Sequence, residues 1–161
     1  IHDFDFLRWT LGDVERVYAK GTHGRTYNRL EHVLVSLRFK NGVIGNVEGT
    51  WLNVGGFGTK FEFACEKGLL THDSKAASGF RSYLQKVQGT GAPGVAVPEN
   101  PLDKSPYTLE LEHFLESVRE GKEPMINGEE GLASLEIALA ALESIATGKP
   151  VVVGGERGVE G

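Results

Sequence analysis

Two residues near the start of the chain, His2 and Asp5, have the types and the spacing that proton transfer requires. Imidazole titrates near neutral pH and can therefore take up and release a proton. Residues three positions apart on a helix lie on one side of it, so the carboxylate of Asp5 is placed to orient the imidazole of His2. The pair predicts a general-base site, although a polar surface helix is the alternative that these two residues alone favour.

The other residue types that carry chemistry do not gather into motifs. The five histidines are far apart, and neither His-x3-His nor Cys-x2-Cys spacing occurs, so the sequence predicts no metal site. The glycine-dense stretch Asn53–Gly58 matches neither a dinucleotide fingerprint nor a Walker loop. Cys65 is the only cysteine, which excludes an internal disulfide, and its position inside an expected strand predicts a buried, unreactive thiol.

The element that must carry the His2–Asp5 pair is a helix over residues 1–11. Three apolar residues, Phe4, Leu7 and Leu11, recur there at helical spacing. A glycine follows directly and is expected to end the helix.

The centre of the predicted sheet is a hairpin over Glu31–Trp51, which turns at an Asn-Gly pair. A two-residue turn would pair Val35 with Glu48 and leave the apolar face unmatched. A three-residue loop with glycine in the left-handed conformation pairs Val35 with Val47, and this is the predicted register because a slip of one residue reverses every side chain.

The hairpin presents two different faces. One is apolar and is expected to pack on another layer: Val33, Val35, Leu37, Phe39, Val43 and Val47. The other is mixed and is expected to meet a second subunit or domain: His32, Leu34, Ser36, Arg38, Ile44 and Glu48. Neither face is expected to be open to water in the assembled protein.

The remaining segments complete an α+β layer. The predicted strands cover residues 14–20, 61–65, 69–71, 81–87 and 151–153, with loops at 21–30 and 89–106. A helix is predicted to start at Ser105-Pro106, and a last helix runs from an Asn127 cap, with Glu130 as its capping-box partner, to Gly148. In that helix a leucine stripe recurs at helical spacing, and small alanines allow close approach to another surface. The pattern predicts an open, mostly antiparallel sheet with helices on one face.

Length and composition are those of one globular domain of 161 residues, with 40% hydrophobic and 24% charged residues. The net charge of −5 and the lack of a basic cluster argue against nucleic acid, and no apolar run is long enough to span a membrane. Cysteine usage fits a cytoplasmic location. The chain opens at Ile1, without methionine and inside a helix, which suggests a piece of a longer protein.

A series of motifs in a fixed order resembles the C-terminal domain of the Gfo/Idh/MocA family, the glucose–fructose oxidoreductase and inositol dehydrogenase type. The motifs are His2–Trp9 with Gly12, Leu37–Phe39 with Asn41-Gly42, Gly49–Trp51, Phe61–Phe63 with Glu66–Leu69, Glu112–Phe114, Gly128–Gly131, Ala140–Ser144 and Gly148–Val151. The resemblance covers nearly the whole chain.

This resemblance implies a two-domain oxidoreductase of which residues 1–161 are the substrate-binding and oligomerisation domain. The N-terminal half, outside this chain, is expected to be a Rossmann domain that binds NAD or NADP. The substrate is expected to be a sugar, a cyclitol or a related polyol, and the assembly a homodimer or homotetramer through the sheet face. The chain alone is expected to be inactive.

The family's catalytic histidine corresponds to His2, which takes the proton of the substrate hydroxyl as hydride leaves the adjacent carbon. Asp5 corresponds to a family aspartate that is expected to have an orienting or structural role and not a catalytic one. Asn53, Phe57 and Lys60 fall in a segment that reaches the substrate in some members, and no residue of this chain is expected to bind cofactor or metal. The alternative is a stand-alone α+β module that dimerises without catalysis.

Overall fold

The computed structural model describes residues 1–24, 29–52, 57–76, 80–84 and 106–154. These residues belong to two compact units. The first unit is Ile1–Leu52 with Gly121–Gly161, and the second is Asn53–Glu120. The α+β class is confirmed, because three helices accompany strands that pair antiparallel throughout the described residues.

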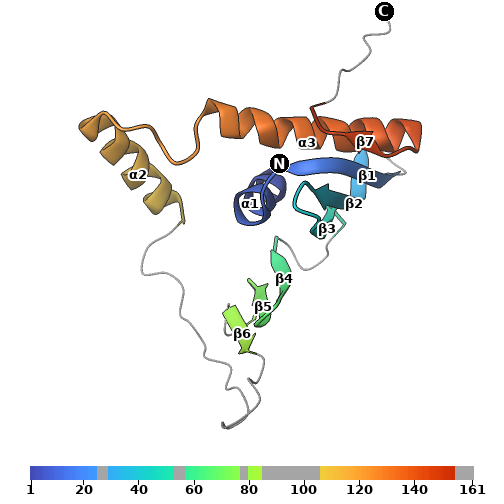
Figure 1. Cartoon of the computed structure of the whole chain (residues 1–161), viewed down its shortest axis with the longest axis horizontal. Coiled ribbons are helices and arrows are strands. Elements are labelled where there is room, and N and C mark those ends of the chain that lie inside the picture. Colours follow the sequence, from blue (N-terminus) through green and yellow to red (C-terminus); the bar gives the residue numbers. More distant parts are fainter. Residues whose placement is uncertain (25–28, 53–56, 77–79, 85–105, 155–161) are drawn as a thin grey trace, which may run out of the picture. The chain divides into compact units, whose positions relative to one another are not determined.

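The first unit is an open sheet covered by helices on one face. Its strands are β1 (Val14–His23), β2 (Leu30–Phe39), β3 (Ile44–Thr50) and β7 (Val151–Val152), in the order β3-β2-β1-β7. Helix α3 (Gly128–Thr147) runs along the sheet, and the short helix α1 (His2–Leu11) lies beside it (Figure 1). β1 extends three residues beyond the predicted strand and takes up the start of the predicted loop.

The hairpin between β2 and β3 has the predicted register. Val35 pairs with Val47, and the N–H of Phe39 donates to the carbonyl of Val43 at 3.0 Å. Gly42 has a φ of +93°, the left-handed region that a three-residue loop needs at this position. Asn41 Nδ2 donates to the carbonyl of Leu11 at 2.7 Å, so the turn also holds the end of α1.

The core lies between the apolar face of the hairpin and α3. Alternate residues of β1 and β2 point into it, as period two requires. The buried apolar residues are Val14, Val17, Ala19, Val35, Leu37, Phe39, Ile137, Ala140 and Ala141. The mixed face of the sheet is open in this chain, with Leu34 49% exposed and Ile44 66% exposed.

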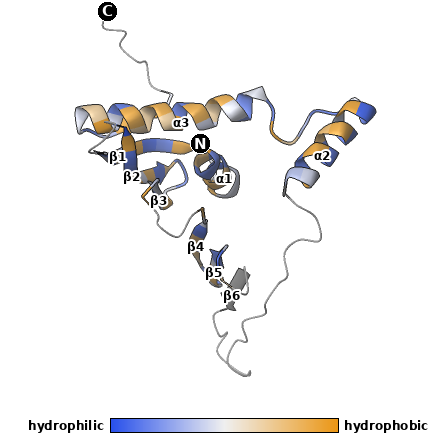
Figure 2. Ribbon diagram, turned by 180° about the vertical axis from the view of Figure 1, so that it is seen from behind, coloured by the Kyte–Doolittle hydropathy of each residue, from blue (hydrophilic) through white to orange (hydrophobic). Residues whose placement is uncertain are grey.

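Helix α3 meets the core through small residues and not through its leucines. Its buried positions are Ser134, Ile137, Ala140, Ala141 and Ser144. The leucine stripe, Leu132, Leu135, Leu139 and Leu142, is exposed. Each leucine stands two residues before a buried position, and two residues turn a helix by about 200°. The stripe therefore faces away from the sheet, and apolar colour continues around much of α3 (Figure 2).

Ser144 closes the edge of the sheet where β7 ends. β7 pairs with only Arg16 and Val17 of β1. Two residues further on, the N–H of Ala19 donates to Ser144 Oγ at 2.9 Å, and the same hydroxyl donates to the carbonyl of Lys149 at 2.7 Å. The fully buried side chain of Ser144 thus provides a hydrogen-bond partner both for the N–H of Ala19 in β1 and for the carbonyl of Lys149, just after the end of α3.

The second unit contains β4 (Lys60–Cys65), β5 (Gly68–Asp73) and β6 (Phe80–Leu84) in that order, and α2 (Pro106–Glu120). The predicted helix start is confirmed at Pro106, whereas residues 85–105 lie outside the described residues. The expectation that Cys65 is buried was wrong, because its thiol is exposed. Cys65 ends β4 and pairs with Gly68, which has no side chain to cover it. No described helix is long and apolar enough to cross a membrane.

Replacement of Ser144 by alanine is expected to lower the free energy of unfolding by about 1–3 kcal/mol, because it leaves the buried N–H of Ala19 without an acceptor. Urea denaturation followed by circular dichroism measures the change. Thr10→Ala is the matched control, since that hydroxyl is exposed and bonds only to carbonyls of its own helix, and it should change the value by less than about 0.5 kcal/mol. Equal effects of the two variants would contradict the part given to Ser144.

Candidate functional site

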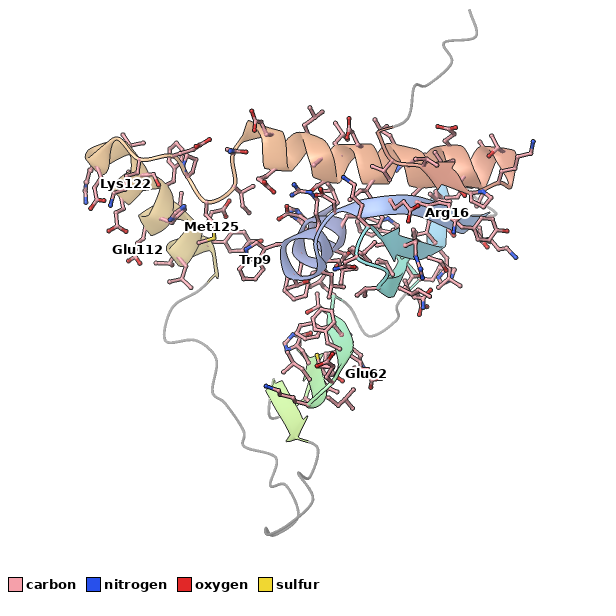
Figure 3. The ribbon with its side chains drawn as sticks, viewed as in Figure 1. Trp9, Arg16, Glu62, Glu112, Lys122 and Met125 are labelled. Atoms are coloured by element: carbon pink, nitrogen blue, oxygen red, sulfur yellow. The ribbon has the colours of Figure 1, made fainter. Side chains whose placement is uncertain are left out.

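His2 is the first residue of α1, and its side chain is exposed. It makes no hydrogen bond or ion pair with the part of the chain that the structure describes. The outer side of the same helix carries Trp9, which is 71% exposed and projects from α1 away from the sheet (Figure 3). The imidazole is thus presented to solvent on a helix whose other side is anchored.

Asp5 makes no hydrogen bond or ion pair with His2, whereas the spacing predicts that it orients the imidazole directly. Its Oδ1 accepts a hydrogen bond of 3.1 Å from the hydroxyl of Ser134 on α3. Ser134 is 2% exposed, whereas Asp5 is half-buried at the edge of the core. The carboxylate therefore ties α1 to α3, and it leaves the ring of His2 free of intramolecular bonds with the described residues.

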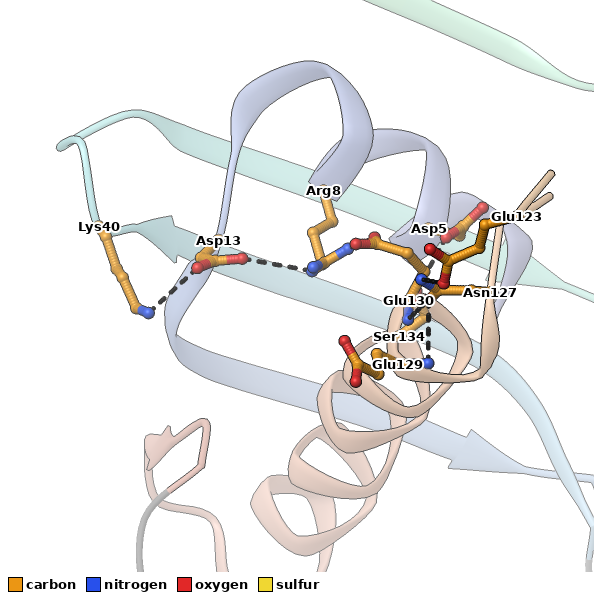
Figure 4. Close-up of polar contacts among 9 residues, drawn as sticks. All are labelled: Asp5, Arg8, Asp13, Lys40, Glu123, Asn127, Glu129, Glu130 and Ser134. Carbon is orange, nitrogen blue, oxygen red and sulfur yellow. Dashed lines mark hydrogen bonds and ion pairs between the residues drawn. The ribbon is translucent and has the colours of Figure 1, made fainter. Parts of the chain in front are cut away.

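One turn further along α1, Arg8 joins three segments of the first unit (Figure 4). Its Nη1 donates to Glu130 Oε2 at the start of α3. Its Nε lies 3.3 Å from Asp13 Oδ1, and Lys40 Nζ in the hairpin loop lies 3.2 Å from the other oxygen of Asp13. The guanidinium thus links α1 to the start of α3 and to Asp13, the residue before β1, and Asp13 is paired in turn with Lys40 in the β2–β3 turn.

The charges in this network shift each other's protonation. The hydrogen bond from Arg8 is the main reason that the pKa of Glu130 lies below its ordinary value of 4.5, with the positive charge of Arg8 adding to it. The same hydrogen bond raises the pKa of Arg8, against a smaller opposing effect of burial. Both shifts favour the ion pair at neutral pH.

The start of α3 confirms half of the predicted capping box. Asn127 Oδ1 accepts from the N–H groups of Glu129 and Glu130, both at 3.0 Å. The side chain of Glu130 is bonded to Arg8 and not to the cap residue that the motif predicts. Glu130, which the motif assigns to a local cap, therefore makes a contact with a residue distant in the sequence.

The other predicted site residues belong to the second unit. Asn53 lies outside the described residues. Phe57 is 95% exposed, and Lys60 begins β4, where its Nζ pairs with Asp73 Oδ2 at 2.9 Å. That hydrogen bond, followed by one from the N–H of Lys75, lowers the pKa of Asp73. Among the described residues, no group of His, Cys, Asp and Glu could hold a metal ion.

Sequence reasoning missed Arg8 and Ser134 as members of this site. Arg8 stands inside a helix between apolar residues, where it has the pattern of an ordinary solvated cation. Ser134 is one of several polar residues in α3, and nothing local in the sequence marks it as a partner of Asp5. A partner more than 120 positions away leaves no signal in the neighbouring sequence. The position of Ser134 on the small-residue face of α3 is the one feature that could have pointed to it.

The fold agrees with that of known proteins that this chain matches. The model of the oxidoreductase family's C-terminal alpha/beta domain, Gfo/Idh/MocA, matches residues 1–153. The chain belongs to this family. The resemblance stated on its motifs is thereby confirmed.

Two curated relatives of the Gfo/Idh/MocA chain are inositol dehydrogenases. Scyllo-inositol 2-dehydrogenase (NAD(+)) of Bacillus subtilis is 26% identical over 170 aligned positions, which cover 100% of this chain and 48% of the relative. Myo-inositol 2-dehydrogenase of Thermotoga maritima is 28% identical, with 90% and 45% covered. The chain thus spans about half the length of these relatives.

The solved structure of a myo-inositol dehydrogenase from Corynebacterium glutamicum is similar to this Gfo/Idh/MocA chain with a TM-score of 0.71 and 26% identity. The similarity covers 96% of this chain and 47% of that one. The described fold is therefore that of one half of such an enzyme.

The ion pair of this Gfo/Idh/MocA domain is expected to weaken in acid. Because the folded-state pKa of Glu130 is depressed, the stability from its charge is fully present above the ordinary pKa of 4.5 and is lost as the pH falls through the folded-state value. Urea denaturation across this range should show the difference in free energy between Glu130→Gln and the unchanged protein shrinking in acid. Glu129→Gln, whose side chain has no such partner, should give a small difference at every pH, and parallel curves for both variants would contradict the prediction.

Proposed function

We propose that this chain is the substrate-binding and assembly domain of a nicotinamide-dependent dehydrogenase that acts on a cyclitol, a sugar or a related polyol. The observation that carries the proposal is His2, an exposed imidazole without intramolecular bonds to the described residues, at the start of a helix fixed to the core. Family membership and the named activities of the inositol dehydrogenase relatives supply the reaction class.

The proposed chemistry is oxidation of a secondary alcohol. His2 accepts the proton of the hydroxyl, and the neutral imidazole is the form that can do so. Its ring has nitrogen atoms available for the substrate, because Asp5 is bonded to Ser134 instead. The helix holds the base at one place and spares the reaction part of the entropy cost of bringing the two groups together.

The proposed cofactor is NAD or NADP, which takes up the hydride from the alcohol carbon when it is bound. Residues for it are not assigned in this chain, since the sequence contains no glycine-rich phosphate-binding fingerprint. A Rossmann domain in the half of the protein that this chain does not cover is the proposed source of the site. Scyllo-inositol 2-dehydrogenase, named for NAD(+), supports this choice of cofactor class.

The second unit is proposed to contribute substrate contacts through Asn53, Phe57 and Lys60. The exposed ring of Phe57 offers an apolar face of the kind that stacks on the C–H face of a sugar or cyclitol. Lys60 carries an exposed ammonium that donates hydrogen bonds, and Asp73 holds it in one direction. These properties suit a ligand with many hydroxyl groups.

The open face of the first unit's sheet is proposed to bind a second copy of this chain. Helix α3 covers the opposite face, while Leu34, Ile44 and Val152 are exposed among charged and polar residues on this one. Apolar residues inside a polar surround are typical of protein interfaces. A homodimer or homotetramer follows as the proposed assembly.

The natural full-length protein should oxidise at least one member of a panel of inositols, sugars and polyols with NAD or NADP. His2→Ala is expected to lower kcat by about 10²–10⁴-fold, because general-base catalysis is worth that much. Initial rates of NAD(P)H formation, followed by the absorbance of the reduced nicotinamide, give the comparison. His23→Ala, an exposed histidine at the end of β1, is the control. Full activity of His2→Ala on the identified substrate would refute the assignment of the base.

Leu34→Lys is expected to break the proposed contact between the sheet faces of two copies, so that the molar mass of the assembly in solution falls. The new ammonium lies opposite Glu48, so the fold of the single chain should tolerate it. Size-exclusion chromatography with light scattering gives the mass. Thr147→Lys, at the exposed end of α3, should leave the mass unchanged. A monomeric unchanged protein at micromolar concentration would refute the proposed assembly.

A further inference from the structure

The first turn of α1, which carries His2, is bonded to α3 by the hydrogen bond between Asp5 and Ser134. Ser134 is almost completely buried on the face of α3 that meets the core, so its hydroxyl needs a partner within the protein. Asp5 provides that partner at 3.1 Å. A hydroxyl donating to a carboxylate is a charge-assisted bond and therefore among the stronger and more directional ones.

This bond fixes the rotation of α1 about its own axis, which apolar packing alone does not fix. Phe4, Leu7 and Leu11 pack against the core cluster, but apolar contact has no preferred direction. The residue before the helix, Ile1, makes no side-chain cap hydrogen bond. Each residue turns a helix by about 100°, so a rotation of α1 around its axis would carry the ring of His2 sideways.

Other polar contacts of α1 lie towards its other end. Arg8 bonds to Glu130 and Asp13, and the carbonyl of Leu11 accepts from Asn41. These contacts hold the last turns of the helix. The first turn, which contains His2, depends on Asp5 for its directional contact with α3.

We propose that Asp5 is a positioning residue for the base, acting through its bond to Ser134 and not through contact with the imidazole. This inference rests on the proposed function of His2. The pair Asp5–Ser134 sets the rotation of the first turn of α1, and the turn carries the ring to the place where the substrate hydroxyl is bound. Ser134 is part of the same device although it touches no reacting group.

The test uses the natural full-length enzyme with the substrate found in the panel. Asp5→Ala and Ser134→Ala each remove the bond and should lower kcat by roughly tenfold with little change in KM, since small misplacements of a catalytic group cost that much or more. Asp5→Asn keeps an oxygen that can accept from Ser134 and should retain most of the activity. Asp3→Ala, an exposed carboxylate beside His2 on the same helix, is the matched control and should have no effect.

Double variants show whether the two residues act together and through His2. Asp5→Ala combined with Ser134→Ala should cost no more than either change alone, because both remove one bond. In a His2→Ala background, Asp5→Ala should cause no further loss. A further loss there, or Asp5→Asn as poor as Asp5→Ala, would overturn the proposal in favour of a direct action of the carboxylate charge.

Hydrogen exchange separates failure of this inference from failure of the proposed function, because it requires no substrate. The amide of Asp5, which bonds to the carbonyl of Ile1, and those of the residues after it in α1 should exchange faster in Asp5→Ala and Ser134→Ala than in Asp3→Ala. Unchanged exchange would overturn the anchoring part of the proposal even if His2 is the base. Faster exchange with unchanged kcat would overturn the positioning part. If Ser134→Ala fails to fold, the Asp5 variants at the half-buried position decide both points.

Discussion

The packing of the small-residue face of α3 on the sheet is the constraint on which the first unit depends. Alanine at two buried positions lets the helix backbone approach β1 closely, and a serine stands at each end of that face. Ser144 completes the edge of β1, and Ser134 holds α1. The two serines are ten residues apart, or about 15 Å along the helix. The same face of α3 therefore bonds to the edge strand and to the helix that carries the candidate site.

Local patterns were sufficient for the parts of the fold that short-range physics determines. The β2–β3 register follows from the alternation of Val35 with its neighbours and from a glycine that accepts a positive φ. The ends of α3 follow from Asn127 and Gly148, which satisfy backbone groups or adopt a left-handed conformation within a few residues. The motifs also led to the family, which the match over residues 1–153 confirms.

The same patterns failed where the deciding partner is distant in sequence. Helical spacing identifies apolar stripes, but it does not say whether the leucines or the small residues of α3 face the sheet, because both sets recur with the same helical period. Spacing also places Asp5 near His2, whereas the buried donor of Ser134 takes its Oδ1. Cys65 has the sequence of a strand interior, yet a glycine opposite it leaves the thiol exposed.

These contacts explain how a short helix can hold His2, the proposed base, in a fixed place. A helix of ten residues is marginal in water by itself, so the order of α1 comes from its tertiary contacts. Two of these contacts are polar bonds to α3, made by Asp5 and Arg8. The position of α1, and with it that of His2, therefore depends on where α3 packs on the sheet. The ring of His2 makes no hydrogen bond with the described residues, because other side chains anchor the helix.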